Sequence, residues 1–177
     1  MLHVHTGARS SIGDAAGRFS SVKVADGEEA LYTKEGVLQH FEEVLESLEL
    51  KQQIAELGSG MNSFFTKKRS LAEFTAMGIA LWKLALEKSF PKEAEAFFNE
   101  YLETSKTLGK GKKHAQMLEL VNKYNELFAP KKTEDFSAIS QYIADNLGSA
   151  SADRKTLQLK LSLTIRKIYQ FIFDHLI

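Results

Sequence analysis

Histidine and carboxylate spacing is the first place to look for chemistry, because helical proteins often build metal sites from these residues. A di-iron site in a helical bundle needs a Glu-x-x-His motif on its helices. None of the five histidines has an acidic residue three positions before it. His3 and His5 form an H-x-H pair, but a zinc site needs further ligands and the neighbouring sequence offers none. The sequence therefore predicts no metal site.

Nucleophilic catalysis and nucleotide binding lack their motifs as well. The chain has no cysteine, which excludes thiolate nucleophiles, disulfides and cysteine-bound metals. It contains no G-x-S-x-G motif. Gly7, Gly13 and Gly17 do not have the spacing of a dinucleotide-binding motif or a P-loop. We expect no catalytic residues and no cofactor, although an enzyme with an unfamiliar site stays open as an alternative.

Basic residues supply the one remaining candidate site. If the predicted helices alternate in direction, three basic segments meet at one pole of the bundle. The Gly-Lys run 109–113 also precedes a helix start, where free backbone amides favour anions. A phosphate or an acidic peptide would suit this pole, whereas nucleic acid is not expected, because no aromatic residue is interleaved for base stacking. Exposed loops are also where ordinary lysines accumulate. The residues of this basic pole are Lys67, Lys68, Arg69, Lys110, Lys112, Lys113, His114, Arg154 and Lys155.

The composition is that of an ordinary globular domain. Of the 177 residues, 44% are hydrophobic and 26% charged, and basic and acidic residues balance at 23 each. No overall field therefore attracts nucleic acid or an acidic membrane. The first residues lack the apolar run of a secretory signal, and charges interrupt the longest apolar stretch, so we expect no membrane insertion. Together with the absence of cysteine, these features favour a cytoplasmic protein.

The stretch 71–90 predicts the central helix of an all-α domain. Ser70 and Glu73 have the spacing of a capping box at its start, and Pro91 follows its end. Large apolar residues cover nearly every side of this stretch, so other helices must enclose it. Small residues that would let those neighbours approach closely are Ala76, Gly78 and Ala80.

Apolar periodicity predicts five further helices, which makes residues 28–177 a single-domain bundle of about six helices. Residues 1–27 are rich in Gly, Ser and Ala and are expected to form a flexible or loosely docked arm. Alternating leucines at 157–165 leave a strand open, but the length of the last segment favours a helix. The further helices are predicted at 33–57, at 91–108, between the loop 109–113 and Pro130, from Thr133 or Asp135 to Leu147, and from Asp153 to the end. The helix after the loop 109–113 carries the apolar residues Met117, Leu118, Val121, Tyr124 and Phe128.

The last helix has more large apolar residues than one buried stripe can hold. The helix is therefore either a second core helix or the interface of a symmetric homodimer. The first functional hypothesis is a non-enzymatic interaction or regulatory module that binds a protein partner or a second copy of itself. The alternative is an anion- or small-molecule-binding domain that uses the basic pole. The predicted stripe is Leu157, Leu161, Ile165, Ile168, Ile172 and Leu176, and the predicted interface residues away from it are Leu159, Leu163, Phe171 and Phe173.

Overall fold

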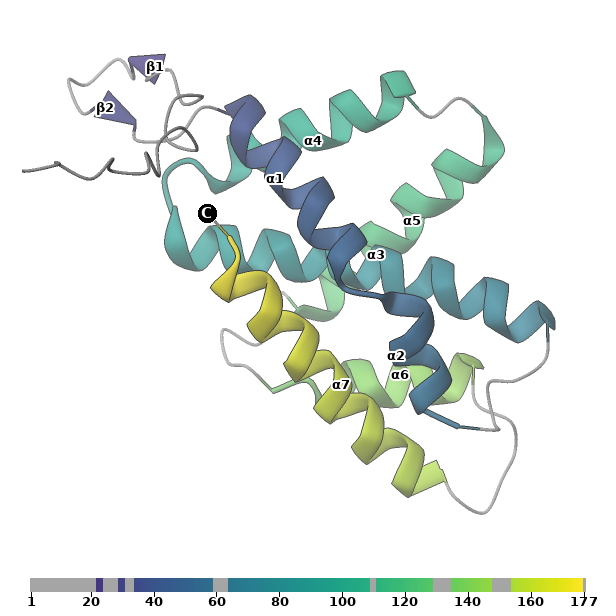
Figure 1. Cartoon of the computed structure of the whole chain (residues 1–177). Coiled ribbons are helices and arrows are strands. Elements are labelled where there is room, and N and C mark those ends of the chain that lie inside the picture. The colour runs from purple at the N-terminus through teal and green to yellow at the C-terminus, as the bar shows by residue number, and fades with distance from the viewer. Residues whose placement is uncertain are drawn as a thin grey trace, which may run out of the picture.

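A computed structural model describes residues 22–23, 29–30, 34–58, 64–108, 111–128, 135–147 and 154–176. These residues form a helical bundle, which confirms the all-α fold, together with one antiparallel pair of two-residue strands in the register Val22 with Ala30 (Figure 1). The elements are β1 (Val22–Lys23), β2 (Glu29–Ala30), α1 (Lys34–Ser47), α2 (Leu50–Glu56), α3 (Phe64–Ser89), α4 (Ala94–Leu108), α5 (Lys112–Phe128), α6 (Ser137–Leu147) and α7 (Arg154–Asp174).

The central helix is α3, as the sequence predicts. It contacts each of the other six described helices, and α5 and α7 pack against it most extensively. Gly78 lets α1 approach α3 closely, since a Cβ at this position would come within 3.2 Å of the Leu45 side chain. The largest fully buried side chains of α3 are Phe74, Met77, Leu81, Trp82 and Leu86.

The start of α3 differs from the prediction. The helix begins at Phe64, well before the predicted capping box, because the segment 64–70 contains no glycine or proline that would end it. Ser70 therefore lies inside the helix, is fully buried, and its Oγ has no hydrogen-bond partner among the described residues. The capping role predicted for Ser70 and Glu73 is wrong.

The predicted helix 33–57 is two helices, α1 and α2, that meet at Glu49. Glu49 has a left-handed backbone with φ of 46°, which costs an L-residue about 1–2 kcal/mol. In one unbroken helix at 3.6 residues per turn, Leu50 and Ile54 would point roughly away from the buried stripe of α1. The break turns them inward, and both are buried where α2 packs on α3.

The C-terminal half follows the predicted boundaries closely. Asp135 caps α6, because its Oδ1 accepts a 3.0 Å hydrogen bond from the Ser137 backbone N–H. The last segment is the helix α7 and not a strand. The Ser140 and Ser162 hydroxyls lie 2.7 Å apart and join α6 to α7. The residues of the predicted stripe that are buried are Leu161, Ile165, Ile168, Ile172 and Leu176.

An aromatic cluster fills the space between α1, α3 and α4. Trp82 is 1% exposed and stacks on Phe41 with ring centroids 4.1 Å apart. Tyr101 meets the Trp82 ring edge-on at 5.4 Å, and Phe98 lies 6.2 Å away. These rings contact one another directly, so they form part of the core and do not surround a cavity. Among the described helices, none combines the length and the apolarity needed to cross a lipid bilayer.

Candidate ligand-binding groove

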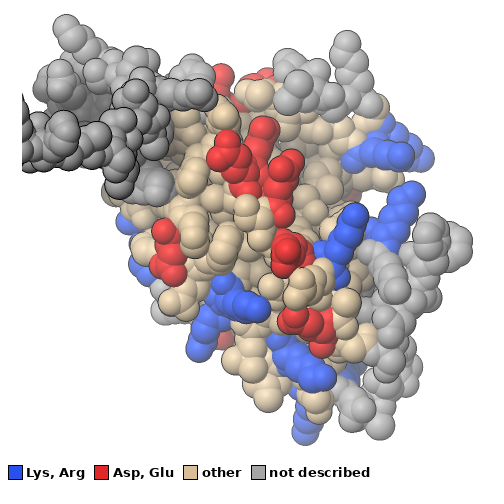
Figure 2. Space-filling model, viewed as in Figure 1, with Lys and Arg blue, Asp and Glu red and all other residues tan. Residues whose placement is uncertain are grey.

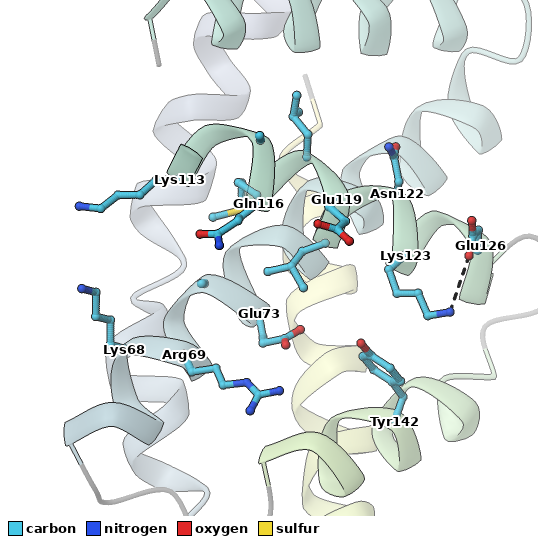
Figure 3. A pocket seen from close by; sticks show the side chains of 15 residues that line it. Lys68, Arg69, Glu73, Lys113, Gln116, Glu119, Asn122, Lys123, Glu126 and Tyr142 are labelled. Carbon is cyan, nitrogen blue, oxygen red and sulfur yellow. Dashed lines mark ion pairs between the residues drawn. The ribbon is translucent and has the colours of Figure 1, made fainter. Parts of the chain in front are cut away.

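A groove of about 1220 Å³ lies between α3 and α5, with α6 closing one side (Figure 3). Residues from the first turns of α3 form one wall, and α5 lies along the other. The lining residues are Lys68, Arg69, Ala72, Glu73, Lys113, Ala115, Gln116, Met117, Leu118, Glu119, Leu120, Asn122, Lys123, Glu126 and Tyr142.

One end of the groove is basic. Lys68 of α3 and Lys113 of α5 are both exposed, and Figure 3 shows them extending from the two walls toward the same end. Arg69 follows Lys68 on α3, and its guanidinium points along the groove toward Glu73 and Tyr142. Three residues of the predicted basic pole, Lys68, Arg69 and Lys113, therefore share one groove.

The other described basic residues of the predicted pole do not line this groove. Lys112 is exposed at the start of α5, and Lys155 is exposed on α7. Arg154 forms an ion pair with Asp145 at the end of α6. His114 has a buried Nε2 atom without a hydrogen-bond partner in the described part of the chain. The Lys67 side chain and all of Lys110 lie outside the described residues.

Glu73 is a buried carboxyl group in the wall of the groove. Only 4% of the residue is exposed, and its Oε2 accepts a 2.7 Å hydrogen bond from the Tyr124 hydroxyl. A buried carboxyl group needs such a donor, because burial of even a neutral polar group without a hydrogen bond costs about 2–7 kcal/mol, and burial of an ionised carboxylate costs more. Tyr124 is itself fully buried on α5, so this bond joins α5 to α3 beneath the groove.

Burial and the charges of Glu73 and Arg69 shift the pKa values of Tyr124 and Tyr142. Burial raises the pKa of Tyr124 well above its usual value, and the charge of Glu73 adds to this effect, whereas Arg69 opposes it. The pKa of Tyr142 is raised by the same causes in the same order, and Arg69 again opposes them. The two tyrosine rings meet edge-on with centroids 5.8 Å apart. Both phenols therefore stay protonated at neutral pH, and the Tyr124 hydroxyl keeps the proton that it donates to Glu73.

Beyond this basic end, α5 lines the groove with one lysine and two exposed glutamates. Lys123 and Glu126 form an ion pair on α5 with an Nζ–Oε2 distance of 3.7 Å (Figure 3). Glu119 is exposed on the same helix. The charge along the groove is thus asymmetric, with its unbalanced cations at the end formed by Lys68 and Lys113.

Sequence reasoning missed Glu73, Tyr124 and Tyr142 as parts of this site. An acidic residue inside a largely apolar helix indicates a buried polar site, but the spacing of Glu73 from Ser70 predicts a helix cap instead. The two tyrosines gave no signal, since tyrosines at helical spacing are ordinary core residues. In the described residues, no group of three or more His, Asp or Glu side chains could hold a metal ion.

The chain matches no known family model, no curated protein and no solved structure. Its function must therefore be inferred from the groove and from the rest of its surface.

Proposed function

We propose that this domain is a non-enzymatic binding module that takes an acidic polypeptide segment in the groove between α3 and α5. The observation that carries this proposal is the pair Lys68 and Lys113, which come from different helices and meet at one end of the groove. Neither lysine forms an ion pair with another described residue, so carboxylates of a bound segment would be their natural counterions.

The size of the groove favours a polypeptide over a small molecule. Pockets for small molecules usually measure about 300–1,000 Å³ and bury most of their ligand. This groove exceeds that range and is only partly enclosed. Gln116 and Asn122 are exposed amides that would bond to the backbone of an extended segment. Apolar contacts would come from Ala72, Met117, Leu118 and Leu120.

The acidic residues of the groove do not cancel its basic end. Glu73 is buried and already accepts the hydrogen bond from Tyr124, and Glu126 is paired with Lys123. Glu119 is exposed, but it lies six residues, or about 9 Å, along α5 from Lys113. Ion pairs of exposed lysines contribute about 0–1 kcal/mol each, so the expected binding is weak and sensitive to salt. Apolar contacts in the middle of the groove would have to supply the rest of the affinity.

The test is binding of a fluorescently labelled glutamate-rich peptide, measured by anisotropy at low and high salt. We expect binding that weakens with salt, and a loss of about tenfold, or about 1.4 kcal/mol, in the double variant Lys68→Glu, Lys113→Glu. The matched control is Lys51→Glu, Lys92→Glu, which changes the net charge equally at two exposed lysines outside the groove.

Two results would contradict this proposal. Wild-type protein that shows no salt-dependent binding would exclude a functional basic end. An equal loss in the control variant would assign the binding to the overall charge of the protein. Inorganic phosphate serves as a competitor, and if it displaced the peptide at comparable concentrations, the site would belong to a small anion instead.

A further inference from the structure

A second surface, separate from the groove, combines opposite charges with uncovered leucines. It consists of the outer faces of α1 and α7, which lie on the same side of the molecule. We propose that two copies of this chain associate through this surface, with α1 of one protomer opposite α7 of its partner.

The apolar part of the surface is on α7. Leu159 is 63% exposed and Leu163 is 58% exposed, and they lie one turn apart on the face of α7 that points away from the core. The other two predicted interface residues have partners within the chain. Phe171 stacks on His175 at 4.3 Å, and the Lys88 Nζ lies 5.3 Å from the centre of the Phe173 ring. Leu159 and Leu163 are thus the most exposed large apolar side chains of this face.

The charged parts of the surface are complementary. Figure 2 shows acidic side chains gathered over α1 and α2, and basic side chains over α7, in the same view. In the described part of α7, Asp174 is the one acidic residue. The exposed acids of α1 and the turn after it are Glu42, Glu43, Glu46 and Glu49, and the exposed bases of α7 outside its pair with α6 are Lys155, Lys160, Arg166 and Lys167.

The two helices are held next to each other within one protomer. His40 Nε2 on α1 lies 2.8 Å from the backbone oxygen of His175, which follows α7, and the two helices run in opposite directions (Figure 1). Because a helix rises 1.5 Å per residue, Glu46 lies about 9 Å from this contact along α1, and Lys167 about 12 Å along α7. The acidic and basic segments are therefore at similar heights on the shared face.

This arrangement suits a two-fold axis. An axis that lies in the face, between α1 and α7 and parallel to them, places α1 of one protomer opposite α7 of its partner. The same rotation places α7 opposite the partner's α1, so the contact occurs twice and closes. Each contact brings carboxylates to lysines and arginine, and it covers Leu159 and Leu163 with the partner's α1–α2 segment. Repulsion between like charges disfavours the alternative in which α7 meets α7.

The experiment is sedimentation equilibrium of the full chain over a wide range of concentrations and at two salt concentrations. We expect a monomer–dimer equilibrium that shifts toward monomer at high salt. The acid-reversed variant Glu42→Lys, Glu46→Lys and the base-reversed variant Arg166→Glu, Lys167→Glu should each be monomeric. An equimolar mixture of the two should dimerise again, because both contacts of the mixed dimer pair opposite charges.

The control variant is Glu119→Lys, Glu126→Lys on α5, which changes the net charge as the acid-reversed variant does and should dimerise like the wild type. Circular dichroism establishes that each variant is folded. Leu163→Glu gives a second test that needs no charge reversal in the acidic segment, and it should weaken the dimer at least tenfold. Three results would each overturn the proposal. The first is a wild type that stays monomeric, and the second is a wild type that forms assemblies larger than a dimer. The third is a wild type that dimerises while the two reversed variants remain monomeric when mixed.

Discussion

The Tyr124 hydroxyl donates a 2.7 Å hydrogen bond to Glu73 Oε2, and this bond joins α5 to α3 inside the bundle. Glu73 and Tyr124 are 51 positions apart in the sequence, and both are buried. The bond fixes the two walls of the groove relative to each other. Loss of this bond should therefore affect the stability of the bundle as well as the shape of the groove.

Tyr124→Phe should lower the free energy of unfolding by about 1–3 kcal/mol, because the buried Glu73 carboxyl group loses its donor. Tyr142→Phe is the control, since this residue lies beside the same carboxyl group but is only partly buried. Urea denaturation measures both. The double variant Glu73→Leu, Tyr124→Phe should lose less than the sum of the single variants. Strict additivity would show that the two side chains do not stabilise each other.

The stability of the domain should fall as the pH rises from about 10 to about 12. Burial, with a smaller contribution from the charge of Glu42, raises the pKa of Tyr101 to about 12, and the pKa values of Tyr124 and Tyr142 are also raised. Unfolded tyrosine titrates near pH 10, so above that pH the unfolded state loses protons that the folded state keeps. The free energy of unfolding then decreases with pH.

Urea denaturation at a series of alkaline pH values, together with tyrosinate absorbance, measures this effect. Tyr101→Phe should show a shallower decrease than the wild type, because one of the perturbed groups is gone. The same slope in Tyr101→Phe and in the wild type would show that Tyr101 titrates normally in the folded protein.

Trp82→Ala should destabilise the protein by about 3–5 kcal/mol, as large-to-small changes of buried aromatic residues do. Trp82 is 1% exposed and contacts the rings of Phe41, Phe98 and Tyr101. Lys83→Ala at the neighbouring position should cost less than about 1 kcal/mol, because its ion pairs with Glu87 and Glu95 are near the surface. Equal denaturation midpoints for the two variants would mean that α3 is not the buried centre of the fold.

Glu49→Gly should stabilise the protein by about 1 kcal/mol, because glycine adopts the left-handed backbone between α1 and α2 without a steric cost. The matched control is Glu46→Gly, three residues earlier at an exposed position inside α1. That change should instead destabilise by about 0.5–1 kcal/mol, because glycine loses more backbone entropy in a helix. Thermal unfolding of the two variants should shift in opposite directions, and a shift in the same direction would argue against a left-handed Glu49.

Local patterns in the sequence were enough to predict the all-α fold and its most buried parts. Apolar residues on nearly all sides of 71–90 predicted a central helix, and the stripe from Leu161 to Leu176 predicted the buried face of α7. Asp135 was correctly predicted as one of two possible caps for α6. These features depend on helical periodicity, on burial and on hydrogen bonds at the ends of helices. All three are determined by residues that are close together in the sequence.

The tertiary structure decided which faces meet. The break at Glu49 follows from the need of Leu50 and Ile54 to reach α3, and this need appears only once α3 is known to lie beside them. Glu73 became part of a groove because α3 starts early and α5 places Tyr124 opposite it. Helical periodicity shows that a face is buried but not what buries it, since the hydrophobic effect has no direction. Lys68 and Lys113 line the same groove, and α1 lies beside α7, although these segments are far apart in the sequence. Both relationships arise only when the chain is folded.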